Sequence, residues 1–216
     1  MYDMKAAIFD MDGTIIDSMW VWNKIDLQYL KKRNIEMPLD LKRCIEDKSF
    51  AEVAQYFKDR FGITDSIKQI QAEWNDMAFY EYSHNVSMKK GVKEYISKLK
   101  SLGIKIGLAT SNCQLLIDAA LKNNELISLF DEITIADEVT RSKNYPDIYL
   151  LAAKKLGVSP KECVVFEDIL PAIRGAKAAG MRVVAVHDVD SECNKEEMTS
   201  LSDLYIYEYA SFLDIV

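Results

Sequence analysis

Four short apolar runs, each ending in polar residues, constrain the fold of this chain more than any other feature. They span residues 6–9, 104–110, 162–168 and 181–188. Their side chains are apolar almost without interruption, whereas a strand with one solvent-facing side alternates apolar and polar residues. Continuous apolar runs of this length predict parallel strands that are buried on both faces of a sheet.

Helical patterns lie between these runs. In residues 92–102, Val92, Ile96 and Leu99 recur at helical spacing, and Gly103 follows at the position of a helix C-terminal stop. Similar patterns span residues 115–121, 148–156 and 172–179. Alternation of strands and helices predicts an α/β fold, a doubly wound, Rossmann-like parallel sheet.

Residues 16–84 interrupt this alternation. They contain three long helical patterns, at 20–30, 49–61 and 67–82, and no convincing strand. We therefore expect an α/β core domain at residues 1–15 and 87–216, with a helical cap domain inserted at residues 16–86. The expected linkers are residues 14–18 and 85–91.

Composition excludes several classes of protein. Of 216 residues, 49% are hydrophobic and 28% are charged, which is typical of a globular domain, and the net charge of −7 disfavours nucleic acid as a partner. No apolar run approaches the roughly 20 residues that cross a bilayer, and Asp3 disfavours a secretion signal. The four cysteines are widely spaced, which disfavours a zinc site or disulfides and indicates a cytoplasmic protein.

Polar residues gather where the predicted strands end. They are Asp10, Asp12, Thr110, Ser111, Asn112, Glu167 and Asp168. Ligands of open parallel sheets bind beyond the carboxyl ends of the strands, so we expect these groups to converge. The acids would repel one another without a cation, and oxygen ligands suit Mg²⁺. The helix expected after Asn112 offers its N-terminus to a phosphate, so the set indicates phosphoryl transfer.

A D-x-D-G sequence alone is also found as a simple polar exit from a strand, but here four motifs occur in order. They are "DMDGT" at 10–14, "GLATSN" with Thr110, "SKNYPDIY" with Lys143, and "VVFEDILPAIRGAKAAGM" with Glu167 and Asp168. Over essentially its full length the chain resembles the haloacid dehalogenase superfamily of phosphotransferases. Its helical insertion resembles the cap of the subfamily that includes β-phosphoglucomutase and phosphoglycolate phosphatase.

The resemblance implies a mechanism with an aspartyl-phosphate intermediate. Asp10 would be the nucleophile and Asp12 the general acid and base. Mg²⁺ would be held by Asp10, the backbone carbonyl of Asp12 and Asp168, with Glu167 near its water shell. Because the dehalogenases of the superfamily lack the second aspartate and need no metal, carbon–halogen chemistry is disfavoured.

The same resemblance implies a phosphate site. Thr110 and Lys143 would bind the phosphate oxygens, and the amide groups of Ser111 and Asn112 would assist. The chain departs from the family pattern at Asn144, where proline is usual, and at Ile169, where serine is usual. Loss of the serine hydroxyl is expected to weaken metal binding.

Cap residues bear on the substrate. Trp20, Trp22 and Arg43 are candidate substrate contacts. Packing within the cap explains the two tryptophans equally well, and solvent exposure is the usual explanation of a charge such as Arg43 on a helical cap. Trp22 replaces a histidine of β-phosphoglucomutase, and Glu46 replaces an arginine that binds a second phosphate there. We therefore expect a monomeric, Mg²⁺-dependent phosphatase acting on a small phosphate monoester such as a sugar phosphate. A phosphomutase is the alternative, and a non-catalytic regulatory binding protein is disfavoured by the intact motifs.

Overall fold

The computed structural model describes residues 3–45, 48 and 50–211. The chain divides into two compact units, one formed by Met1–Ser18 with Val86–Val216 and the other by Met19–Asn85. The boundaries expected from the sequence lie between residues 15 and 16 and between residues 86 and 87. They differ from those of the structure by three residues and by one residue. Each unit is described by itself below.

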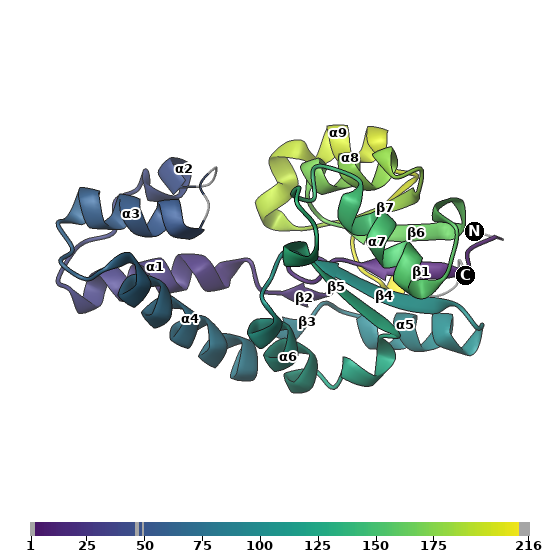
Figure 1. Ribbon diagram of the computed structural model, residues 1–216, viewed down its shortest axis with the longest axis horizontal. Helices are drawn as coiled ribbons and strands as arrows, with labels where there is room; N and C mark the ends of the chain where they lie inside the picture. The colour runs from purple at the N-terminus through teal and green to yellow at the C-terminus, as the bar shows by residue number, and fades with distance from the viewer. Residues whose placement is uncertain (1–2, 46–47, 49, 212–216) are drawn as a thin grey trace. The chain divides into compact units, whose positions relative to one another are not determined.

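A parallel sheet is the centre of the first unit (Figure 1). Within the described residues it has six strands in the order β5-β4-β1-β6-β7-β8. They are β1 (Ala6–Phe9), β4 (Lys105–Thr110), β5 (Glu132–Ile135), β6 (Cys163–Glu167), β7 (Arg182–Val186) and β8 (Leu204–Ile206). The four predicted strands form the middle of this sheet, so the predicted α/β parallel fold is confirmed. The strands that were not predicted, β5 and β8, are short and lie at the two edges.

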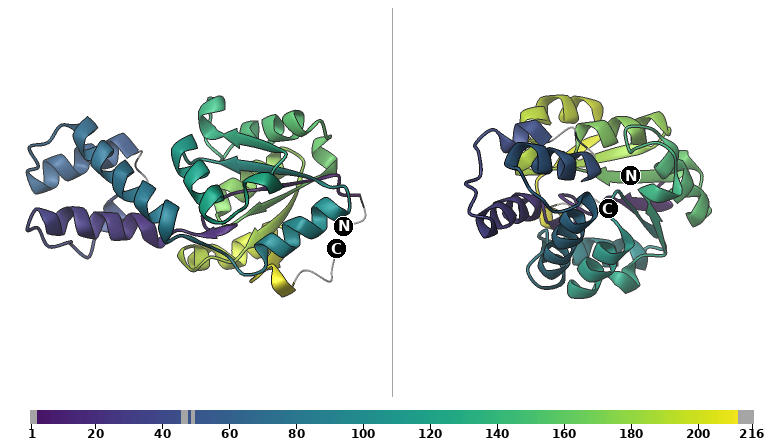
Figure 2. Two further views of the ribbon diagram at one scale, coloured as in Figure 1. Left: turned by 90° about the horizontal axis from the view of Figure 1, so that it is seen from below. Right: turned by 60° about the vertical axis from the view of Figure 1, so that its left-hand side comes forward.

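Helices cover both faces of the sheet, as Figures 1 and 2 show. They are α5 (Val92–Ser101), α6 (Gln114–Asn123), α7 (Asp147–Leu156), α8 (Leu170–Ala178) and α9 (Lys195–Leu201). Alternate strand residues face opposite sides. Ile8 and Val165 pack in a cluster with Ile173 of α8, whereas Phe9 stacks on Phe166 at 4.4 Å between ring centroids and contacts Tyr95 of α5. Burial on both sides explains why the strands are continuously apolar.

A small antiparallel ribbon, β2 (Ile16–Asp17) with β3 (Ser87–Met88), lies at the base of the inserted segment. Ile16 pairs with Met88, and Asp17 pairs with Ser87. The sequence indicated linkers here and no strand, because two-residue strands are too short to show a period. The outgoing and returning segments are thus paired with each other.

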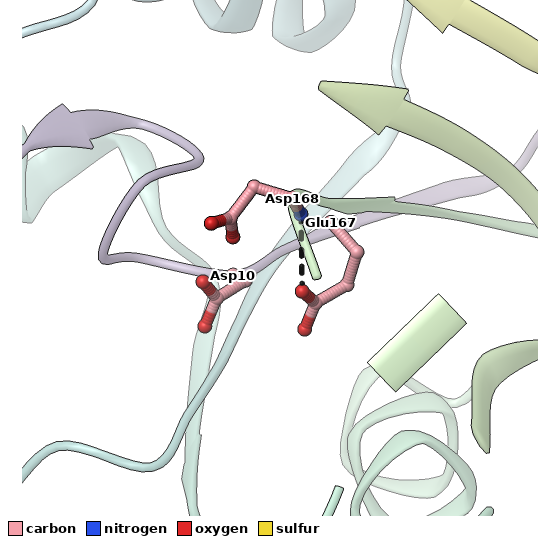
Figure 3. Close-up of side chains that lie close together, drawn as sticks. All are labelled: Asp10, Glu167 and Asp168. Carbon is pink, nitrogen blue, oxygen red and sulfur yellow. Dashed lines mark hydrogen bonds between the residues drawn. The ribbon is translucent and has the colours of Figure 1, made fainter. Parts of the chain in front are cut away.

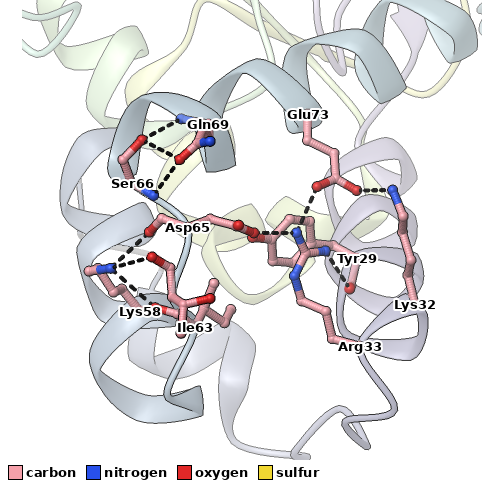
Figure 4. A network of polar contacts seen from close by, with 10 residues as sticks. Tyr29, Lys32, Arg33, Lys58, Ile63, Asp65, Ser66, Gln69 and Glu73 are labelled. Carbon is pink, nitrogen blue, oxygen red and sulfur yellow. Dashed lines mark hydrogen bonds and ion pairs between the residues drawn. The ribbon is translucent and has the colours of Figure 1, made fainter.

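The second unit is helical. Its described helices are α1 (Trp20–Lys32), α2 (Leu41–Ile45), α3 (Phe50–Phe61) and α4 (Ile67–His84). Trp74 is fully buried at its centre, with ring centroids of Phe57 at 4.9 Å and Tyr29 at 5.5 Å. Figure 4 shows the polar network at its surface, where Arg33 binds Asp65 at 2.7 Å and Glu73 at 2.8 Å.

None of the described helices combines the length and the apolar character that crossing a membrane requires.

Asp26 of α1 gives this unit a pH-dependent stability. Burial raises the pKa of its carboxyl group from 3.8 to about 7. The folded state therefore keeps a proton that the unfolded chain loses, and stability falls as pH rises from about 4 to about 7. A pKa rise of this size would correspond to a loss of about 4 kcal/mol in stability. Partial exposure of the Asp26 carboxyl group reduces this value. We expect Asp26→Asn to stabilise the protein by about 2 kcal/mol near pH 8 and to change little near pH 4.

Urea unfolding at the two pH values measures this difference. The control is Asp76→Asn, which changes an exposed carboxylate in the same unit. A gain of equal size at both pH values would contradict the assignment of the effect to ionisation of Asp26.

Candidate active site

Three buried carboxylates meet at the carboxyl end of the sheet (Figure 3). Asp10 follows β1, Glu167 ends β6 and Asp168 comes next. Because β1 and β6 are paired neighbours, with Phe9 opposite Phe166, their ends deliver the three acids to one place. One oxygen from each carboxylate lies within 4.8 Å of the others. The structure thus brings together three of the acids that the sequence indicated.

Lys143 is the cation within this cluster. Its ammonium group donates to Asp10 and, at 2.5 Å, to Oε1 of Glu167, and its side chain is only 7% exposed. Burial raises the pKa of Asp10 to about 6; the charge of Lys143 opposes this rise, and that of Glu167 adds to it. Burial disfavours the charged form of Lys143, but the two carboxylates outweigh that effect and raise its pKa above the ordinary value. Lys143 is therefore held as an ammonium group between the carboxylates of Asp10 and Glu167.

Asp168 has one satisfied oxygen and one unsatisfied oxygen. The hydroxyl of Thr14 donates to Oδ1 at 2.8 Å, whereas Oδ2 is buried and has no hydrogen-bond partner among the described residues. Burial, followed by the charges of Asp10 and Glu167, raises the pKa of Asp168 well above its usual range. A buried carboxylate oxygen without a donor is uncommon and calls for an explanation. An oxygen-rich cluster with such an orphan atom fits a hard divalent cation such as Mg²⁺.

Asp12 lies beside the cluster, after the first strand. Two donors orient its carboxylate: the hydroxyl of Ser18 at 2.7 Å and the amide of Asn112 at 3.0 Å. Both of its oxygens are therefore engaged by residues of other segments. Gly13 takes a left-handed conformation (φ 75°), which turns the chain directly after Asp12.

Thr110 and its neighbours end β4, which lies on the other side of β1. Thr110 is buried, and its hydroxyl accepts the backbone N–H of Asn112 at 3.1 Å. The Asn112 side chain accepts the backbone N–H of Cys113 at 2.9 Å, and Ser111 is exposed. The contact between Asn112 and Asp12 joins this strand end to that of β1.

The loop that carries Lys143 packs directly on α8. A Cβ atom added to Gly175 would lie 2.0 Å from the carbonyl oxygen of Lys143. We expect Gly175→Ala to displace this loop, because backbone atoms cannot yield as a flexible side chain can. Overpacking of this kind typically costs 1–3 kcal/mol, so we expect about 2 kcal/mol of lost stability.

The resemblance predicts that Lys143 binds the substrate phosphate, so the same variant is expected to lose more than about tenfold in turnover. Chemical unfolding and steady-state kinetics measure the two effects. Arg174→Ala, at an exposed position on the same helix, is the control. Unchanged stability and turnover in Gly175→Ala would show that the loop position is not fixed by this contact.

The predicted cap residues belong to the helical unit. Trp22 packs edge to face on Phe50 at 5.6 Å, the ammonium group of Lys24 lies 5.2 Å from the ring centre of Trp20, and Arg43 is exposed on α2. Their contacts with substrate stay a prediction. Glu46, which stands where β-phosphoglucomutase has an arginine that binds a second phosphate, lies outside the described residues.

Sequence reasoning missed three donors to the acidic groups. Thr14 donates to Asp168, Ser18 to Asp12, and Tyr149 to Glu167. Thr14 and Tyr149 stand inside the motifs "DMDGT" and "PDIY", which was the only available signal. The partner of Thr14 is 154 positions away, so no local pattern could identify it.

Comparison with known proteins identifies the class. The sequence model described as haloacid dehalogenase-like hydrolase matches residues 7–186. The chain belongs to this family. It is 33% identical over 187 residues to "Putative phosphatase YhcW" of Bacillus subtilis, covering 85% of this chain and 83% of that protein. It is 30% identical over 189 residues to "Phosphorylated carbohydrates phosphatase" of Thermotoga maritima, covering 87% of this chain and 88% of that protein.

A solved structure agrees in fold. The crystal structure described as "putative beta-phosphoglucomutase" from Thermotoga maritima has a TM-score of 0.85 and 27% identity, covering 98% of each chain. The predictions of family and fold class are therefore confirmed. So is the enzyme class, a hydrolase of phosphate esters.

Proposed function

We propose that this protein is a Mg²⁺-dependent phosphatase that hydrolyses a small phosphate monoester, a sugar phosphate or similar metabolite, through an aspartyl-phosphate intermediate. The observation that carries the proposal is the buried cluster of Asp10, Glu167 and Asp168, with Lys143 inside it. One oxygen of Asp168 has no hydrogen-bond partner among the described residues. Two relatives carry names that indicate the substrate class, phosphorylated carbohydrates phosphatase and hexitol phosphatase B of Escherichia coli.

Asp10, Asp168 and the backbone carbonyl of Asp12 would hold the Mg²⁺, with Glu167 near its water shell. When bound, the ion would offset the repulsion among the acids and stabilise negative charge on the phosphoryl oxygens. Lys143 supplies a fixed positive charge at the same place, which suits a phosphate dianion. Thr110 and the amide groups of Ser111 and Asn112 would complete the phosphate site.

In the first step an oxygen of Asp10 attacks phosphorus, and the bond between phosphorus and the ester oxygen breaks. Asp12 gives its proton to the departing alkoxide and becomes a carboxylate. In the second step Asp12 takes a proton from water, whose oxygen attacks the phosphorus of the aspartyl phosphate. Inorganic phosphate leaves, and both aspartates return to their starting states. Ser18 and Asn112 orient Asp12 for these transfers.

The test is a screen of phosphorylated sugars and polyols with Mg²⁺, in which released phosphate and isomerised sugar phosphate are both measured. Phosphate release that requires Mg²⁺ is the expected result. Isomerisation without net phosphate release would favour the phosphomutase alternative, and binding without turnover of any ester would favour a regulatory protein.

Asp168→Asn tests the metal assignment. The amide keeps the size of the side chain but removes the negative charge and one oxygen ligand. We expect the Mg²⁺ concentration for half-maximal activity to rise about tenfold or more, since loss of a charged ligand weakens binding of a hard cation. Asp137→Asn, at an exposed position, is the matched control. An unchanged Mg²⁺ titration for Asp168→Asn would remove Asp168 from the metal site.

A further inference from the structure

Tyr149 has a buried hydroxyl group beside the proposed active site, and the mechanism above gives this group no role. It lies in the first turn of α7, six positions after Lys143, and is fully buried. Its hydroxyl donates to Oε1 of Glu167 at 2.9 Å. Burial raises the pKa of the phenol well above its ordinary value, and the charge of Glu167 adds to the rise, so the group stays a donor at neutral pH.

The bond from Tyr149 completes the set of donors around Glu167. Oε1 accepts from Tyr149 and, at 2.5 Å, from the ammonium of Lys143, while Oε2 accepts the backbone N–H of Asp168 at 3.2 Å. Glu167 is fully buried, so protein groups and not solvent set the direction of its carboxylate. The three donors come from α7, from the loop before it and from the end of β6.

Glu167 in turn fixes Lys143. The ammonium group bridges Glu167 and Asp10, so its position depends on both carboxylates. Asp10 would change its charge during the reaction, because it would form an ester bond to phosphorus. Glu167 would then be the constant partner of Lys143, and the Tyr149 hydroxyl holds that partner in place. Small displacements of a charged group at a reacting centre have large effects on rate.

We propose that Tyr149 is a positioning residue whose hydroxyl fixes Glu167 and, through their shared oxygen, the ammonium group of Lys143 that faces the phosphate. The inference rests on the proposed phosphatase function. It assigns a task to the tyrosine of the "PDIY" segment beyond its contribution to the core.

Tyr149→Phe removes the hydroxyl and keeps the ring. The matched control is Tyr29→Phe, since Tyr29 is also fully buried and its hydroxyl has no hydrogen-bond partner in the described part of the chain. We expect Tyr149→Phe to lower kcat about tenfold or more and to weaken binding of Mg²⁺ and of orthovanadate, a phosphate analogue, by about tenfold each. Loss of an outer-shell partner has effects of this size in metal sites. Tyr29→Phe should leave all three quantities within about twofold.

Three measurements separate positioning from packing. Thermal unfolding shows whether each variant folds. Calorimetric titration measures the affinity for Mg²⁺ and does not depend on turnover. In the third, vanadate binding is compared among Tyr149→Phe, Lys143→Met and the double variant. If Tyr149 acts through Lys143, its removal adds little once Lys143 is replaced, so the two effects are not additive.

Wild-type Mg²⁺ and vanadate affinities in Tyr149→Phe would overturn the inference, as would additive losses in the double variant or equal losses in Tyr29→Phe. These results leave the proposed phosphatase intact if the wild-type protein releases phosphate. Absence of Mg²⁺-dependent phosphate release by the wild type contradicts the proposed function itself, and the Mg²⁺ titration still decides whether Tyr149 orders the acidic cluster.

Discussion

Asp10→Asn is expected to reduce phosphate release by about 10⁴-fold or more and to leave the fold intact. An amide cannot replace the carboxylate as the attacking group, and removal of a nucleophile typically leaves only the catalysis that comes from binding and charge stabilisation. The apo protein should not lose stability, because the substitution removes one of three buried negative charges while Lys143 keeps Glu167 as its partner. Phosphate release at saturating Mg²⁺, measured together with thermal unfolding, tests both statements.

Asp137→Asn is the control, because it makes the same change of net charge at an exposed residue outside the cluster. Its turnover should equal that of the wild type. Turnover of Asp10→Asn within about tenfold of the wild type would contradict the assignment of Asp10 as the nucleophile. A variant that is inactive because it is unfolded would show its failure in the thermal unfolding curve.

Lys143→Met should have the second-largest effect, on stability and on activity together. The substitution leaves Asp10, Glu167 and Asp168 buried near one another without a cation. Removing one partner from a buried ionic cluster typically costs 3–5 kcal/mol, because the remaining charges are uncompensated. We therefore expect the free energy of unfolding at neutral pH to fall by about 4 kcal/mol. Turnover should fall at least 10²-fold, because the proposed mechanism places this charge against the phosphate.

The sign of the pH dependence is specific. Burial raises the pKa of Asp10, and loss of Lys143 removes the charge that opposes this rise. Stability should therefore be lost as pH rises and regained near pH 5. Added Mg²⁺ should also restore part of it, through binding to the folded state. Lys90→Met, which breaks an exposed pair with Glu208, should cost less than about 1 kcal/mol. Equal losses in the two variants would contradict the buried-cluster argument.

The sequence predicted the centre of the sheet and not its edges, for a physical reason. Strands β1, β4, β6 and β7 are buried on both faces, which makes their sequences continuously apolar. The edge strands β5 and β8 contain exposed positions such as Glu132 and Leu204, so they lack that signal. The longer helices, α1 and α3 to α8, were predicted to within a few residues, because each has one apolar face against the sheet or the cap core. The short helices α2 and α9 were not predicted.

Strand ends indicated the acids of the site, and the motif "SKNYPDIY" indicated Lys143, which lies in a loop. Asp10, Glu167 and Asp168 lie together because β1 and β6 are neighbours, which follows from the fold class. The bond from Tyr149 to Glu167 and that from Ser18 to Asp12 depend on side-chain direction after packing, which residue spacing does not encode. The roles of the cap residues Trp20, Trp22 and Arg43 stay predictions for the same reason.

The pairing of Ile16 with Met88 and of Asp17 with Ser87 has a consequence for protein engineering. Because the two crossing segments run side by side in opposite directions, the ends of the helical insert are already adjacent. A foreign insert with adjacent ends could be joined at residues 18 and 86 without rerouting any strand of the α/β unit. The ribbon therefore makes this chain a suitable host for exchanging whole inserts among relatives, with the α/β unit left unaltered.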